Sequence, residues 1–124
     1  GLGRLTVEDY EVGGYEIPKD SLILLSQFIA HRDARFWENA ETFLPERWER
    51  QSIKEAAKKY IYFPFSSGVR GCIGESFAWT EGILLVATLA SKWKLKLSPE
   101  QKIALQPLMT LRPKFGMKMT IERI

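Results

Sequence analysis

Hydrophobic positions in the first 26 residues come in short runs that turn-forming residues separate. Residues 4–7 are β-prone, and residues 22–25 form an apolar run of the kind that fits a buried strand. Between them, residues 12–15 carry a Gly-Gly hairpin signal and residues 18–21 carry a second turn signal. This part of the chain is therefore predicted to form a small β-sheet.

The middle of the chain changes to a helical pattern. Residues 53–59 mix charged side chains with alanine, which favours a short helix. From Ile73 to Ala90 the sequence is helical again, and the second half of this stretch is apolar on almost every side. A helix without a polar face is enclosed by other protein, and the rest of the 124 residues offers little to enclose it. We therefore expect a long buried helix that segments outside this chain normally cover.

The last third of the chain returns to strand patterns. Residues 93–97 alternate apolar and charged side chains, as a half-exposed strand does. Residues 105–111 and 117–121, with a Pro- and Gly-containing turn between them, are predicted to form a terminal hairpin. Helices and short strands in these amounts indicate the α+β fold class.

The stretch from Phe63 to Gly74 surrounds the only cysteine of the chain, Cys72, with turn formers. Its glycines can take positive φ and let the backbone approach a flat ligand closely. Cys72 lies where this loop is predicted to meet the first turn of a helix. Free N–H groups and the helix dipole at that position favour a thiolate over a thiol. Arg70 adds a positive charge two residues before the cysteine.

A single thiolate limits the metal chemistry of the chain. Zinc and iron–sulfur clusters need about four protein ligands. Haem needs only an axial ligand from the protein, because the porphyrin supplies the other four donors. A nucleophilic pair of Cys72 with His31, the only histidine, is conceivable, but the sequence alone does not bring the two together.

The cysteine loop resembles the haem-binding loop of the cytochrome P-450 family of haem-thiolate monooxygenases. The family loop reads Phe-x-x-Gly-x-Arg-x-Cys-x-Gly, and all its fixed residues occur here at the same spacing: Phe65, Gly68, Arg70, Cys72 and Gly74. The resemblance implies haem b (iron protoporphyrin IX) as the cofactor and Cys72 as the axial thiolate of its iron. A thiolate ligand donates electron density that favours cleavage of an O–O bond.

The resemblance also implies a role for each neighbour of the cysteine. Arg70 would pair with a haem propionate, and Phe65 would shield the sulfur from water. Gly68 and Gly74 would allow close approach of the backbone to the ring, and the N–H groups that follow Cys72, beginning with that of Ile73, would bond to the sulfur.

Parts of the chain outside the loop resemble the family as well. Residues 14–20 match its Gly-Tyr-x-Ile-Pro-Lys-Gly signature, except that Asp20 replaces the last glycine. Residues 43–48 match Phe-x-Pro-Glu-Arg-Phe, with Trp48 in place of the last phenylalanine. Arg4 aligns with a position whose arginine often contacts a haem propionate; the alternative is an ordinary exposed arginine at a strand end.

Three further positions take their expectations from the family. His31 would be a structural histidine, satisfied and partly buried. Arg47 would lock onto the Glu-x-x-Arg motif of an upstream helix, which these residues do not contain; a buried arginine without its carboxylate costs several kcal/mol. Met109 and Thr110 would line a substrate pocket, or else be ordinary sheet residues.

The implied reaction inserts one oxygen atom of O₂ into a small organic substrate. Electrons would come from a redox partner, a ferredoxin, flavodoxin or reductase, and Lys58 and Lys59 could help an acidic partner to dock. Because the oxygen-activating helix of the family is absent, we expect no independent catalysis by this chain. Haem binding by the chain alone should be weak, since only one face of the porphyrin would be covered.

Residues 1–124 are thus predicted to be a single partial domain, the C-terminal part of a mainly α cytochrome P-450 fold. In order it would contain a small β-sheet, an irregular meander, the Cys loop, the long helix and the terminal hairpin. Two alternatives stay open: a non-catalytic haem-binding module, and an interaction fragment in which Cys72 is only structural. Haem stoichiometry and the pKa of the thiol would separate them.

Composition adds three exclusions. The 18 basic and 15 acidic residues give a net charge of only +3, and the basic residues are spread, which argues against nucleic-acid binding. One cysteine excludes an internal disulfide and permits a reducing compartment. The apolar run of residues 82–91 is too short to cross a bilayer, so no membrane span is predicted. A cytoplasmic location is favoured, and an upstream membrane anchor stays possible.

Overall fold

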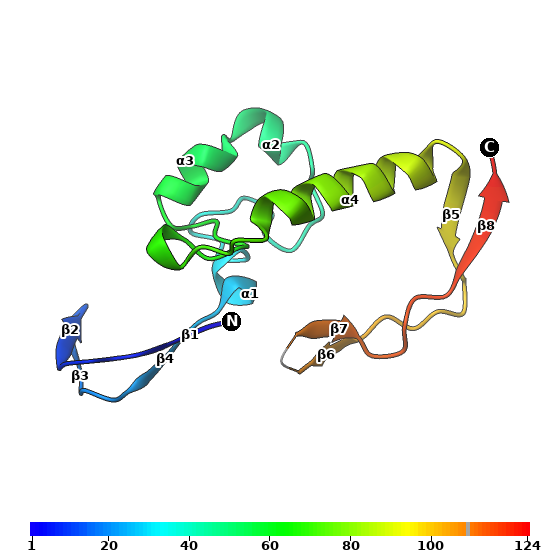
Figure 1. The fold of residues 1–124 in the computed structure, drawn as a ribbon. Helices are drawn as coiled ribbons and strands as arrows, with labels where there is room; N and C mark the ends of the chain where they lie inside the picture. The colour runs from blue at the N-terminus through cyan, green and yellow to red at the C-terminus, as the bar shows by residue number, and fades with distance from the viewer. Residues whose placement is uncertain (109) are drawn as a thin grey trace. The chain divides into compact units, whose positions relative to one another are not determined.

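The computed structural model describes residues 1–108 and 110–124, and the chain divides into two compact units (Figure 1). The first unit is Gly1–Ile73 and the second is Gly74–Ile124. The cysteine loop closes the first unit, and the long helix opens the second.

Two pairs of antiparallel strands begin the first unit. Strand β1 (Leu2–Leu5) pairs with β4 (Leu22–Leu25), and β2 (Tyr10–Val12) pairs with β3 (Tyr15–Ile17). The Gly-Gly turn between β2 and β3 is confirmed, with φ of 59° and 82° at its two glycines. Such left-handed angles are what a two-residue hairpin turn of this type requires.

Two details of this sheet differ from the sequence-based expectation. The first strand is Leu2–Leu5 and not residues 4–7, because its register is set by pairing with β4. Strand β4 exists as predicted, but it is not buried: Leu22 and Leu24 are 68% and 70% exposed.

The second turn of the sheet is built around Asp20. Its φ is +63°, and its N–H donates to the Thr6 carbonyl at 2.9 Å. The Thr6 hydroxyl in turn donates to the Pro18 carbonyl at 2.7 Å. A left-handed conformation suits glycine best and is tolerated by aspartate, which explains why Asp20 can stand at the place where the resembled signature has glycine.

Three short helices follow the sheet: α1 (Gln27–Ala30), α2 (Arg47–Arg50) and α3 (Ile53–Lys58). The predicted helix over residues 53–59 is confirmed. Among the described residues only Trp37, at 3% exposure, and Ala56, at 1%, are buried hydrophobic residues. The core of the first unit is therefore the Trp37 indole, which contacts α1 and α2, together with the small Ala56 of α3, rather than an extended layer.

Helix α4 (Glu75–Ala90) dominates the second unit. The predicted long helix is confirmed, but it begins at Glu75 and not at Ile73, since Gly74 takes the N-cap position. None of its residues is buried, and Ile83, Leu84 and Val86 are each more than 60% exposed. An apolar helix without cover is what we expected of this chain by itself.

Two strand pairs complete the second unit. Strand β5 (Trp93–Leu97) pairs with β8 (Met119–Arg123), and β6 (Leu105–Pro107) pairs with β7 (Leu111–Pro113). The predicted strand over residues 93–97 is confirmed, although all its residues are exposed. The predicted hairpin of residues 105–111 with 117–121 is wrong: the last strand skips that neighbour and pairs with β5, while β6 and β7 pair with each other. Of the predicted pocket pair, Met109 lies outside the described residues, and Thr110 is exposed.

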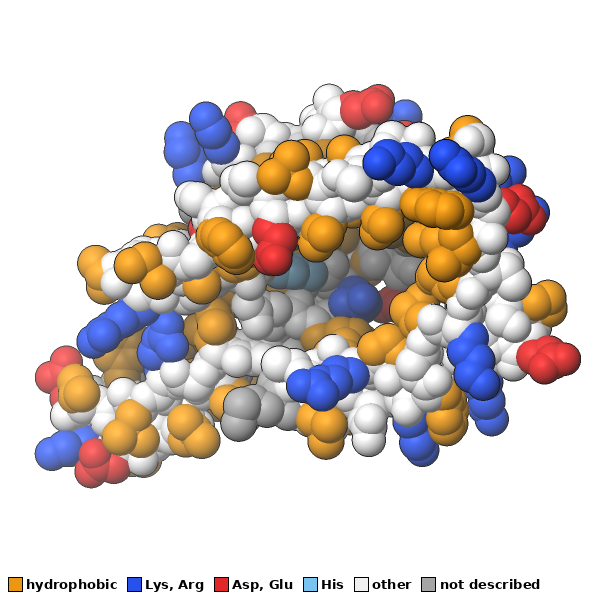
Figure 2. Space-filling view, turned by 45° about the vertical axis from the view of Figure 1, so that its right-hand side comes forward, with side chains coloured by type: hydrophobic (Ala, Val, Ile, Leu, Met, Phe, Trp, Pro, Cys, Tyr) orange, Lys and Arg blue, Asp and Glu red, His pale blue; other side chains and the backbone are white. Residues whose placement is uncertain are grey.

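The exposed area shows how little of this chain is buried. Its accessible surface is 10970 Å² for a mass of 14.3 kDa. A compact globular chain of this mass exposes roughly 6,800 Å², and two separate globules of half the mass expose roughly 8,200 Å². Hydrophobic side chains are accordingly spread over the visible face of the molecule, with Lys and Arg side chains between them (Figure 2).

Candidate functional site

The backbone of the cysteine loop is folded by its own hydrogen bonds. The Cys72 N–H donates to the Phe65 carbonyl at 2.8 Å, and the Gly71 N–H donates to the Gly68 carbonyl at 2.9 Å, which closes a 3₁₀ turn over Gly68–Arg70. The first of these bonds spans seven residues. It ties the cysteine to the phenylalanine of the loop motif, so the two ends of the motif are held together in the first unit.

Two residues of the loop take left-handed backbone angles. Gly68 has a φ of +66°, as its place in the resembled motif suggests. Ser66 has a φ of +69°, which the sequence did not indicate, because serine adopts this region rarely. A side chain on Gly71 would place its Cβ 3.2 Å from the Gly68 carbonyl oxygen. A larger residue at Gly71 would therefore crowd the Gly68 carbonyl. At Gly68 the positive φ favours glycine, although there is space for a side chain.

The thiol of Cys72 is exposed, and it is a free cysteine. Apolar side chains flank it without cover: Val69 and Ile73 are 101% and 103% exposed. A free thiol next to uncovered apolar side chains fits a flat apolar macrocycle with an iron centre. These residues therefore fit the haem that the loop motif implies.

Two arginines belong to this surface. Arg4, on β1, donates through Nη2 to the Ser66 hydroxyl at 3.4 Å and through Nη1 to the Gly3 carbonyl at 2.8 Å. The structure thus brings Arg4 to the cysteine loop across 62 positions of sequence. Arg70 is exposed and makes no hydrogen bond or ion pair with any residue that the structure describes. Arg4 thus bonds to the loop and Arg70 is part of it, so both bring positive charge to the loop.

Helix α1 contacts the segment that leads into the loop. The Gln27 side-chain amide donates to the carbonyls of Phe63 and Pro64 at 3.1 and 3.0 Å. The Nε2 atom of His31 accepts the Phe63 N–H at 2.9 Å. Sequence analysis predicted a satisfied, partly buried His31, which is confirmed. It missed Gln27, because nothing in the pattern links a glutamine to a backbone 36 positions away.

The imidazole of His31 is held in its neutral form. Burial, and secondly the charge of the neighbouring Arg32, lower the pKa of His31 below its ordinary 6.5. The centroid of the His31 ring lies 5.0 Å from that of Tyr62 and 5.1 Å from that of Phe63. Since the Phe63 N–H occupies Nε2, the conceivable nucleophilic pair with Cys72 is not formed among the described contacts.

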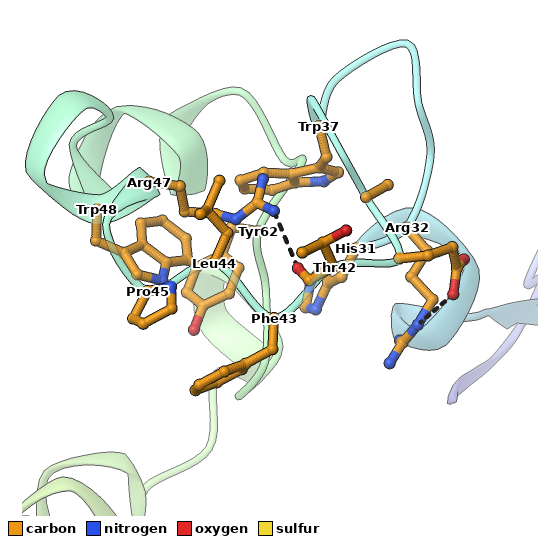
Figure 3. Close-up of a pocket in the computed structure, with 12 residues that line it drawn as sticks. His31, Arg32, Trp37, Thr42, Phe43, Leu44, Pro45, Arg47, Trp48 and Tyr62 are labelled. Atoms are coloured by element: carbon orange, nitrogen blue, oxygen red, sulfur yellow. Dashed lines mark hydrogen bonds and ion pairs between the residues drawn. The ribbon is translucent and has the colours of Figure 1, made fainter.

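A cleft of about 410 Å³ lies beside this histidine, with aromatic walls (Figure 3). Trp37, Trp48 and Tyr62 form a connected ring cluster, with centroid distances of 4.7 to 6.2 Å. The Trp37 indole N–H also donates to the Ala30 carbonyl at 3.0 Å, which fastens α1 to the cluster. Phe43 is 93% exposed at the rim of the same cleft.

Arg47 crosses this cleft and bonds to backbone instead of a carboxylate. Its guanidinium donates to the carbonyls of Glu38, Asn39 and Thr42 at 2.9, 3.2 and 3.4 Å, and it lies 5.9 Å from the Trp37 ring (Figure 3). No ion pair of Arg47 occurs among the described residues. Being half-buried and bonded to three carbonyls, the charge is not left without partners.

Within residues 1–108 and 110–124, no group of three or more His, Cys, Asp and Glu side chains is arranged to hold a metal ion. The search for a helix that is long and apolar enough to cross a membrane finds none in the same residues. The cysteine loop is therefore the part of the described chain with the clearest cofactor chemistry.

Comparison with known proteins identifies the family of the chain. The family model described as cytochrome P450 matches residues 1–120. The chain belongs to the cytochrome P450 family. It is 37% identical over 108 residues to cyclooctatin synthase of Streptomyces melanosporofaciens, covering 87% of this chain and 23% of that protein. It is 34% identical over 105 residues to cytochrome P450 3A7 of Homo sapiens, covering 85% of this chain and 21% of that protein.

A solved structure shows the same fold. The retinoic acid-bound cyanobacterial CYP120A1 superposes with a TM-score of 0.87 at 25% identity, over 95% of this chain and 28% of that structure. The predicted fold class, an α+β portion of the cytochrome P450 fold, is thereby confirmed. The chain spans about a quarter of the length of the relatives that it matches.

Proposed function

We propose that this chain is the haem-thiolate portion of a cytochrome P450 monooxygenase, with Cys72 as the axial ligand of haem b. The observation that carries the proposal is the exposed Cys72 thiol at the end of a loop that hydrogen bonds already fold. Arg4 and Arg70 supply the positive charge for the propionates, and Val69 and Ile73 supply apolar contact for the ring. A haem held there would supply the chemistry that activates O₂ for insertion into an organic substrate.

Each residue of the loop has a task in that function. The Cys72 sulfur is the ligand, and the neighbouring N–H groups, from Ile73 on, temper its charge. The side chain of Phe65, which is partly buried, limits access of water to the sulfur. Gly68 and Gly74 keep the backbone close to the ring.

Residues 1–124 are proposed to be one partial domain of the parent enzyme, to which both units belong. The cleft at Arg47 supports this view: aromatic residues line it, and the half-buried guanidinium in it has no ion-pair partner among the described residues. A Glu-x-x-Arg helix of the parent would supply that carboxylate. Catalysis also needs the parent's oxygen-activating helix, so the 124 residues alone are expected to be inactive.

The partners follow from the same reaction: a small organic substrate, and a ferredoxin, flavodoxin or reductase that delivers electrons. Lys58, in the last turn of α3, and Lys59, at its C-cap, are exposed, and no described residue forms an ion pair with either. Charge reversal of both should slow electron transfer from an acidic partner in a salt-dependent manner. Unchanged rates at low salt would remove these lysines from the docking surface.

The absorption spectrum of the ferrous–carbonyl complex tests the ligand assignment. Wild type, Cys72→Ala and a control loop variant, Ser67→Ala, are mixed with haem, reduced and exposed to carbon monoxide. A strongly red-shifted Soret band in wild type and Ser67→Ala, lost in Cys72→Ala, supports thiolate ligation. Identical spectra for wild type and Cys72→Ala would favour the second candidate, a fragment in which the cysteine is structural.

A further inference from the structure

Side chains at the two ends of helix α1 form hydrogen bonds to the backbone that leads into the cysteine loop. Gln27 donates two hydrogen bonds to the carbonyls of Phe63 and Pro64, and His31 accepts the N–H of Phe63. The two side chains are four positions apart, which places them on one face of the helical turn. Three hydrogen bonds of 2.9 to 3.1 Å therefore fix Phe63 and Pro64, immediately before the loop motif.

The helix that makes these contacts is itself anchored. The Trp37 indole donates to the Ala30 carbonyl in the last turn of α1, and Trp37 is the largest buried side chain of the described residues. The Ser26 hydroxyl accepts the Ile29 N–H and caps the other end of the helix. A helix this short is not stable in isolation. The contacts at its two ends therefore stabilise α1 and hold Gln27 and His31 in position.

We infer that Gln27 and His31 are positioning residues for the haem-thiolate ligand, acting through the Phe63–Pro64 backbone. From Phe63 the path to the ligand is short. The Ser66 N–H donates to the Phe63 carbonyl at 3.1 Å, and the Phe65 carbonyl accepts the Cys72 N–H at 2.8 Å. Neither side chain touches the ligand; both set the backbone that carries it. We call the three hydrogen bonds of Gln27 and His31 to Phe63 and Pro64 the clamp. The inference rests on the proposed function only in that Cys72 is taken as the ligand, because the clamp consists of contacts within the chain.

The clamp has a built-in dependence on pH. Only a neutral imidazole can accept the Phe63 N–H at Nε2, since the protonated ring is a donor at both nitrogens. The groups around His31 in its cleft are Arg32 with its ion-pair partner Glu41, Arg47, and the Tyr62 ring. Because burial and Arg32 lower the pKa of His31, its contribution is present above pH 6.5 and is lost as the pH falls through the lowered value.

The donor role of Gln27 can be separated from simple packing. Gln27→Glu keeps the size of the side chain and removes both donors, whereas Gln27→Lys retains donors. Gln101 is the matched control, because its side-chain amide donates to the Lys102 and Gly116 carbonyls and its described hydrogen bonds stay in the second unit. Gln101→Glu therefore removes an equivalent pair of bonds elsewhere.

Amide hydrogen exchange at Phe63 and Cys72 of the haem-free chain is the first readout. Gln27→Glu should lower the protection of both amides by about tenfold, Gln27→Lys should restore part of it, and Gln101→Glu should leave it unchanged. Equal protection in wild type and Gln27→Glu would overturn the inference. This readout needs no haem, so it decides on the clamp even if the proposed function fails.

The pH profile and the haem spectrum complete the test. Protection of the Phe63 amide should fall below pH 6.5 in wild type, and it should lose this dependence in His31→Gln, whose side-chain oxygen accepts at every pH. In the haem-bound protein, Gln27→Glu should lower the fraction of the red-shifted ferrous–carbonyl band relative to Gln101→Glu. The same pH profile in wild type and His31→Gln would overturn the role of His31.

Discussion

The two units of this chain differ in what they bury. The first unit holds its shape through side chains that bond to distant backbone, such as Gln27, His31 and Arg47, and through one buried indole. The second unit contains the most regular element, helix α4, yet none of that helix is buried. Regular secondary structure therefore does not indicate where the chain is self-supporting. The irregular part carries the candidate site, and it also holds Trp37 and Ala56, the buried hydrophobic residues of the described chain.

The largest effect that would test this contrast is expected from Trp37→Ala. The indole is 3% exposed, touches the Trp48 and Tyr62 rings and donates to Ala30. Its loss should lower the free energy of unfolding of the first unit by about 3–5 kcal/mol. Urea unfolding followed by circular dichroism measures it.

Trp93→Ala in the second unit is the matched control. Trp93 is 38% exposed, so by buried area its removal should cost about two thirds as much. Equal losses for the two tryptophans would contradict the view that only the first unit has a core of its own.

Arg47→Ala should have the next largest effect. It removes three hydrogen bonds from a charged group to the carbonyls of Glu38, Asn39 and Thr42, and should cost about 2–3 kcal/mol of stability in the first unit. The control is Arg50→Ala, at an exposed arginine of the same helix, which should stay within about 0.5 kcal/mol of wild type. If both variants unfold at the same urea concentration, the carbonyl contacts of Arg47 contribute nothing.

Asp20 offers a smaller, conformational test. The φ of Asp20 is +63°, where a β-branched side chain is strained. Asp20→Val should therefore lower the free energy of unfolding by about 1–2 kcal/mol. The free energy of unfolding of Asp20→Gly should be equal to that of wild type or higher by less than about 1 kcal/mol. Thermal unfolding of the two variants compares them directly, and a stable Asp20→Val would show that this turn relaxes.

The smallest effect is expected at the surface of the second unit. Lys96 and Glu122 form an ion pair of 2.7 Å across β5 and β8, and about half of each side chain is exposed. Lys96→Ala should cost about 0.2–1 kcal/mol, and the difference should shrink at high salt. A larger loss that persists at high salt would mean that this sheet is more tightly built than its exposure indicates.

Sequence reasoning succeeded where the signal is local. The Gly-Gly turn, helix α3 and helix α4 all follow from residues within a few positions of one another. The loop motif likewise led to the family through a pattern confined to ten residues. In each of these cases, backbone conformation and side-chain identity determine the outcome without help from distant parts of the chain.

Long-range outcomes were missed. The pairing of β8 with β5 depends on a return across more than twenty residues, for which the strand pattern gives no partner. The exposure of β4 depends on what covers it rather than on its own residues. Gln27 could not be found, because a polar residue in the first turn of a short helix has many possible roles, and only the fold brings it to Phe63 and Pro64.

The most direct test of the central claim is X-ray absorption at the iron edge of the haem-bound protein. The claim is that Cys72 ligates the haem iron from a loop that the first unit holds in place. We expect a sulfur atom in the first coordination shell of iron in wild type, and its replacement by a nitrogen or oxygen ligand in Cys72→Ala. A first shell of nitrogen and oxygen alone in wild type would contradict the claim.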